Sequence, residues 1–166
     1  MLTLGDVFAF AAIFVGLAAT VWGATVLTLL LARAKTEAAA SQIKARPFWS
    51  GLLGFAAALG AALAGIIFLN MPHPILKLIG AIIVMAQGLS GVLGAASVAF
   101  LAAERIRAAD PSISLYGALT RSSLLVVALA SIPFIGWFLV TPILLSYGAG
   151  ALFAKKSAPP VAVMAP

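Results

Sequence analysis

The sequence predicts an all-α integral membrane protein, built as one domain from a bundle of four transmembrane segments. Its hydrophobic fraction is 64%, whereas a soluble domain has about 45–50%. Charged residues make up 8% of the chain, against about 25% in a soluble domain. These charges gather in short connections between long uncharged stretches. A soluble fold of 166 residues could not bury so much apolar surface, so lipid is the expected surrounding.

The first three segments are predicted at residues 7–32, 47–70 and 78–103. The first and third each contain 26 uncharged residues, and a spanning helix needs about 20. Pro47 suits the first turn of a helix. Pro72 and Pro74 predict a tight connection between antiparallel neighbours. No Lys or Arg precedes Asp6, so the first segment is interpreted as a retained helix rather than a signal peptide.

The fourth segment, residues 122–154, is unusual in length. Its 33 uncharged residues are too many for one straight span, and two full crossings need about 40. Pro133 and Gly136 predict a helix break near the middle, because proline lacks a donor and glycine permits unusual conformations. The segment is then either one bent span, which the length slightly favours, or a re-entrant hairpin. Residues 155–166 are rich in Pro and Ala and are predicted to form a disordered tail.

The basic residues predict the orientation. The two polar connections, Arg33–Arg46 and Glu104–Arg121, hold seven of the ten Lys and Arg residues. The short connection between the second and third segments holds only Lys77. Basic loops stay in the cytoplasm, so we expect the N-terminus outside, in a bacterial cytoplasmic (inner) membrane. A bent fourth span would place Lys155 and Lys156 outside, giving seven basic residues inside and three outside. A hairpin would place these two lysines inside, giving nine inside and one outside, which the charge rule prefers.

Chemistry that needs ionisable groups is not expected. The four segments contain no Asp, Glu, His, Lys or Arg, so acid–base catalysis and proton-coupled transport lack their usual residues. His73 is the only histidine and the chain has no cysteine. We therefore predict no catalytic residues, no cofactor and no metal site. The clustered bases are expected to contact membrane lipids rather than nucleic acid.

Polar and small residues inside the segments predict helix packing. Gln87, Ser90 and Ser97 lie in the third segment, where they either hydrogen-bond to a neighbouring helix or line a solute path. Small residues recur at spacings of three and four in the second and third segments, as in the pairs Ala61/Gly65 and Ser90/Gly94. Trp22, in the middle of the first segment, is expected to pack against another helix or a partner.

Short motifs rich in Pro, Gly and aromatic residues lie at Arg46-Pro47, Gly51–Gly54, Gly88–Gly94, Ile132–Trp137 and Gly148–Leu152. Together they resemble a family of bacterial membrane segments found alone or fused to bactofilin-type, polymer-forming cytoskeletal proteins. The resemblance extends from Arg46 to Ala154 and is most specific at Ile132–Trp137. It implies a membrane anchor or scaffold and no enzymatic site, although this chain has no bactofilin region attached.

The sequence therefore predicts a non-catalytic membrane anchor, scaffold or accessory subunit. Its expected partners are membrane lipids and either another membrane protein or further copies of itself. A passive channel or small-solute permease is the first alternative, and Gln87 separates the two because a pore would place it on a water-filled path. An accessory subunit of an electron-transfer complex is the second alternative.

Overall fold

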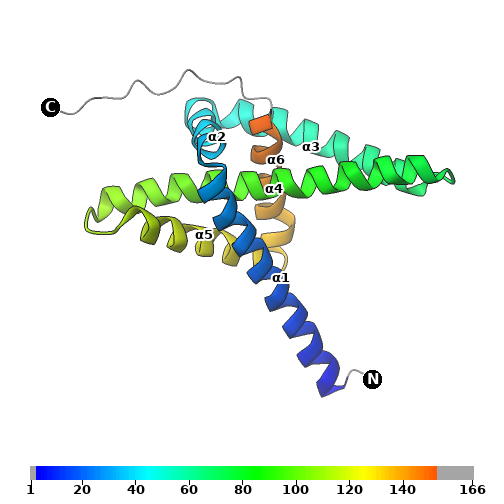
Figure 1. Cartoon of the computed structure of the whole chain (residues 1–166), viewed down its shortest axis with the longest axis horizontal. Helices are drawn as coiled ribbons and strands as arrows, with labels where there is room; N and C mark the ends of the chain where they lie inside the picture. The colour runs from blue at the N-terminus through cyan, green and yellow to red at the C-terminus, as the bar shows by residue number, and fades with distance from the viewer. Residues whose placement is uncertain (1–2, 153–166) are drawn as a thin grey trace.

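The computed structural model describes residues 3–152, and every regular element within that range is helical. Figure 1 shows the arrangement. Three helices are long and apolar enough to cross a membrane, and a sharply bent pair forms a fourth unit. The predicted fold class is thereby confirmed. The elements are α1 (Leu4–Leu31), α2 (Arg33–Ala45), α3 (Pro47–Asn70), α4 (Pro74–Ala109), α5 (Leu115–Ser131), the π-helix η1 (Gly136–Val140) and α6 (Thr141–Leu152).

The first polar connection forms a helix of its own. A capping box between Thr3 and Asp6 starts α1, and α2 follows directly after Ala32. Within α2 the Arg33 Nε donates to Glu37 at 2.7 Å. An ion pair between Lys44 and Glu104 links α2 to the far part of α4. The two polar connections therefore lie on the same side of the molecule.

The hairpin of α3 and α4 confirms the tight connection at the two prolines. His73 is the N-cap of α4, where its Nδ1 accepts from the Ile75 N–H at 3.3 Å. The segment predicted at 78–103 is longer in the structure, because α4 has 36 residues. At 1.5 Å per residue it measures about 54 Å, whereas the hydrocarbon core is about 30 Å thick. Helix α4 is therefore longer than a straight crossing of an apolar layer requires.

The second polar connection contains a short turn and the start of the next helix. Asp110 Oδ1 accepts from the hydroxyl of Ser112 at 2.6 Å and from its N–H at 3.0 Å. These bonds lower the pKa of Asp110 below its usual value. Ser114 then caps α5 by accepting from the Gly117 N–H. The helix begins at Leu115 rather than at the predicted Ser122, so Arg121 lies within it.

The predicted break in the fourth segment is confirmed. Regular α5 stops at Ser131, and the next helix begins at Gly136. Phe134, between them, has a φ of 65°, which is uncommon for a residue other than glycine. The two halves are bent by 108°. The sequence placed the end of this segment at Ala154, and the predicted tail at 155–166 lies outside the described residues.

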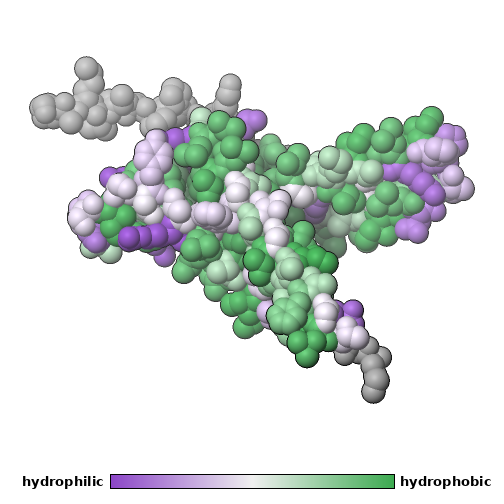
Figure 2. Space-filling model, turned by 60° about the horizontal axis from the view of Figure 1, so that its bottom comes forward, coloured by the Kyte–Doolittle hydropathy of each residue, from purple (hydrophilic) through white to green (hydrophobic). Residues whose placement is uncertain are grey.

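The interior is built mainly from small side chains. Helix α4 forms its centre, since α1, α2, α3, α5 and α6 all pack against it. Figure 2 shows a broad hydrophobic surface with hydrophilic residues gathered at the extremities. An apolar exterior around a tight small-residue core is the arrangement expected in lipid. The core residues are Leu29, Ala95, Ala96, Ala99, Ala103, Ala118, Leu119, Val126 and Leu144.

Candidate functional site

The three polar residues predicted in the third segment use their hydrogen bonds within the helices. Gln87 Nε2 donates to the Ala58 carbonyl of α3 at 2.9 Å. Ser90 Oγ donates to the Gln87 carbonyl at 2.7 Å, and Ser97 Oγ donates to the Leu93 carbonyl at 2.8 Å. Ser97 is fully buried. Gln87 thus links α3 to α4, and the three side chains do not line a common passage in this structure.

Three further buried hydroxyl groups behave in the same way. Thr25, Ser122 and Ser123 are fully buried, and each donates to a carbonyl of its own helix. Ser123 Oγ also accepts from Trp22 Nε1 at 3.1 Å. Trp22 therefore joins α1 to α5, as its position in the first segment suggested. Local bonds of this kind allow hydroxyls to sit in an apolar interior without a solute path.

Glycines let α6 approach α3 and α4 at backbone distance. A Cβ at Gly148 would overlap the Ser90 carbonyl oxygen of α4, and one at Gly94 would overlap the Leu144 carbonyl oxygen of α6. On the other side of α6, a Cβ at Gly54 would overlap the Ser146 carbonyl oxygen. Only residues without a side chain permit such proximity. The predicted pair Ser90/Gly94 thus packs against α6.

The end of α6 lies beside the start of α3. A Cβ at Gly150 would be 2.7 Å from the Ser50 carbonyl oxygen, and α6 also packs against α2. The fourth segment therefore turns back toward the side that carries α2. Gly136 supports this turn, because a Cβ there would overlap the carbonyl oxygen of Ala130 across the break. Pro133 and Gly136 thus have structural roles at the bend.

Helix α1 has one packed face and one bare face. Phe14, Trp22, Thr25 and Leu29 are among the less exposed positions, which face the bundle, and the N-terminal end of α1 projects away from the other helices (Figure 1). Six small residues occupy the roughly opposite side at alternating spacings of four and three. We name them the α1 small-residue face: Gly5, Ala9, Ala12, Gly16, Ala19 and Gly23.

The α1 small-residue face is open. All six of its residues are exposed. A Cβ at Gly16 or Gly23 would meet no atom of residues 3–152 within 4 Å outside its own helix backbone. Sequence reasoning recognised small-residue spacing in the second and third segments and missed it here. The alternating spacing in residues 5–23 was the signal that could have revealed it.

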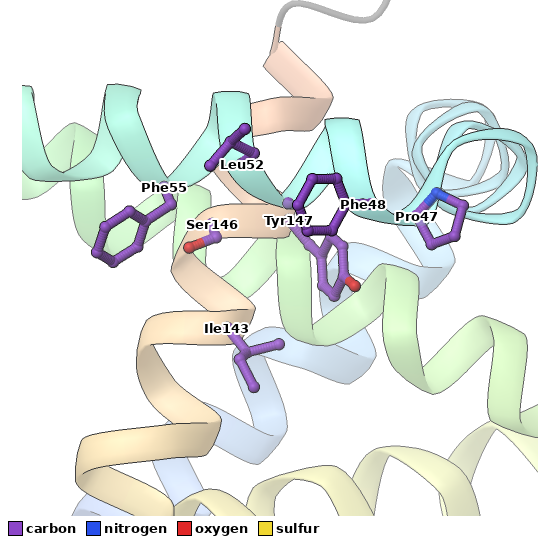
Figure 3. A pocket seen from close by; sticks show the side chains of 8 residues that line it. Pro47, Phe48, Leu52, Phe55, Ile143, Ser146 and Tyr147 are labelled. Carbon is purple, nitrogen blue, oxygen red and sulfur yellow. The ribbon is translucent and has the colours of Figure 1, made fainter.

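An apolar groove lies between the start of α3 and α6, with a volume of about 330 Å³. Figure 3 shows Tyr147 projecting from α6 toward α3, near Phe48 and Pro47. The Tyr147 ring contacts Gly51, whose Cβ would lie 3.5 Å from it. A second apolar hollow, of about 450 Å³, lies where Phe10 and Phe14 of α1 face Pro133 and Trp137. Neither cavity is lined by Asp, Glu, His, Lys or Arg among the described residues.

The described residues offer no metal site. Within residues 3–152, no three His, Cys, Asp or Glu side chains gather as metal ligands would. His73 instead caps α4.

Comparison with known proteins gives no relative. No family model matches the chain, and neither the curated proteins nor the solved structures contain a match.

Proposed function

We propose that this protein is a non-catalytic membrane anchor, scaffold or accessory subunit that holds another membrane helix against α1. The observation that supports the proposal most is the α1 small-residue face, which lies roughly opposite the bundle and is exposed. The partner helix belongs either to another membrane protein or to a second copy of this chain. The resemblance to bactofilin-associated membrane segments agrees with such a role and stays a hypothesis.

The physical basis is the way helices associate in lipid. Large apolar side chains give little driving force for helix association in a bilayer, because lipid tails are as apolar as leucine. Close backbone contact, which small residues permit, provides the van der Waals attraction instead. The same principle operates inside this molecule, where Gly54, Gly94 and Gly148 bring three helices together. The α1 small-residue face offers a helix from outside the same kind of surface.

The buried polar groups favour this function over the channel alternative. Gln87 and Ser97 donate to backbone carbonyls of α3 and α4 rather than facing a shared cavity. A passage would need groups free to replace the hydration of a solute. No specific observation favours an accessory role in electron transfer, so that alternative stays a hypothesis from the sequence.

The proposed location is a bacterial cytoplasmic membrane with the N-terminus outside. The support is the charge distribution, since Arg33–Arg46 and Glu104–Arg121 hold most of the basic residues. The Lys44–Glu104 ion pair joins these two connections, which agrees with both facing the cytoplasm.

The test is purification from native membranes in a mild detergent, comparing wild type with Gly16→Ile. Wild type is expected to elute with a partner chain or as a homo-oligomer. Gly16→Ile is expected to lose most of this association, because the branched side chain keeps the two backbones apart. Gly60→Ile is the matched control, since a Cβ at Gly60 of α3 also meets no described atom within 4 Å. The readouts are the mass of the purified complex and the identity of any second protein.

Two results would contradict the proposal. One is a wild-type protein that leaves the membrane as a single chain with lipid and detergent alone. The other is equal loss of the partner from Gly16→Ile and Gly60→Ile, because the association would then not depend on the α1 small-residue face.

A further inference from the structure

We propose that the groove between α3 and α6 binds one anionic phospholipid, with an acyl chain in the groove and the phosphate beside Arg46. This site is separate from the α1 small-residue face and requires no partner protein. We call it the α3–α6 groove; its lining residues are Pro47, Phe48, Gly51, Leu52, Phe55, Ile143, Ser146 and Tyr147.

The lining of the groove fits a hydrocarbon chain. Its side chains are apolar except for the hydroxyl groups of Ser146 and Tyr147. The Ser146 hydroxyl is already used, because it donates to the Pro142 carbonyl at 2.6 Å. The volume of about 330 Å³ lies within the range of small-molecule sites. From Pro47 to Phe55 the helix rises about 12 Å, so an extended part of a chain can lie along it (Figure 3).

One end of the groove lies at the expected depth of lipid headgroups. Trp49 is exposed at the start of α3, and Trp and Tyr rings concentrate at the membrane–water interface. The Tyr147 ring covers Gly51, and its hydroxyl makes no hydrogen bond within residues 3–152. A tyrosine with an apolar body and a free hydroxyl suits the boundary between acyl chain and phosphate.

The charge at this end selects an anion. Arg46 directly precedes the lining residue Pro47 and is exposed. The two ion pairs found in residues 3–152 join Arg33 to Glu37 and Lys44 to Glu104, so neither neutralises Arg46. A guanidinium binds phosphate oxygens through paired donors. An anionic headgroup is therefore a better match than a zwitterionic one.

The test is native mass spectrometry of the delipidated full-length protein, titrated with palmitoyl-oleoyl phosphatidylglycerol or phosphatidylcholine. Wild type is expected to retain one phosphatidylglycerol in preference to phosphatidylcholine. One basic residue near the surface contributes about 1 kcal/mol, so Arg46→Gln should bind phosphatidylglycerol about five-fold more weakly. Arg107→Gln removes the same charge at the far end of α4 and should bind as wild type does.

A second pair of variants tests the acyl chain. Leu52→Trp fills the groove and should weaken binding of both lipids, whereas Leu53→Trp, which does not line it, should have no effect. Equal affinity for the two lipids in wild type would overturn the proposal. So would equal effects of Arg46→Gln and Arg107→Gln, or a protein chain rather than a lipid crosslinked to a photoreactive group at Leu52.

Discussion

At Gly148 the backbones of α6 and α4 come so close that a methyl group would overlap the Ser90 carbonyl oxygen. Gly94 meets α6 from the opposite direction, where a Cβ would lie 2.8 Å from the Gly148 nitrogen. Both obstacles are backbone atoms, which cannot turn away as a flexible side chain would. At Gly88 of α4, in contrast, an added Cβ would have no described atom within 4 Å outside its own helix backbone. Gly94 and Gly88, which lie in the same helix, therefore differ sharply in how well they accept a side chain.

This contrast yields a stability prediction. Gly148→Ala should lower the free energy of unfolding by about 1–3 kcal/mol, the usual cost of overpacking. Gly88→Ala should leave stability unchanged or raise it by up to about 1 kcal/mol, because alanine is the better helix former. Unfolding by titration with sodium dodecyl sulfate in mixed micelles measures both. Equal stability of Gly148→Ala and wild type would show that α6 does not approach α4 as described.

The fourth segment illustrates what the sequence could and could not predict at the scale of an element. Pro133 and Gly136 act locally, so the break between α5 and η1 was predictable from the residues alone. The 108° bend and the return of α6 toward α2 depend on tertiary contacts. The slight preference for a bent span followed from length. The structure places Gly150 beside Ser50, which favours the hairpin that the charge count preferred.

This arrangement predicts the membrane topology. Since α6 ends beside the start of α3, a reporter fused to the C-terminus should be cytoplasmic. Single cysteines at Ser41 and Ser112 should resist a membrane-impermeant thiol reagent in intact cells, while one at Pro72 should react. The chain has no cysteine of its own, so each label reports one position. A periplasmic reporter with Ser41→Cys protected would instead indicate that the fourth segment crosses completely.

For the whole molecule, the sequence predicted the apolar exterior and the division into four hydrophobic segments, because both follow from composition and charge spacing. It did not predict which surfaces of the helices meet. Trp22 could have packed against several helices, and only the structure pairs it with Ser123. The bare side of α1 likewise becomes visible once Thr25 and Leu29 are seen facing the bundle. Packing between helices that are distant in sequence depends on the complementarity of their surfaces, which cannot be deduced from local sequence patterns.

The most direct test of the central proposal is cysteine crosslinking along α1 in native membranes. Single cysteines at consecutive positions from Ala9 to Thr20 are labelled with a benzophenone maleimide and irradiated, so that a neighbouring chain is captured even when it carries no thiol. We expect crosslinked products at Ala9, Ala12, Gly16 and Ala19, with few at Phe14 and Leu17, because the former share the α1 small-residue face. Absence of any crosslinked protein, or equal yields around the helix, would contradict a partner helix docked on that face.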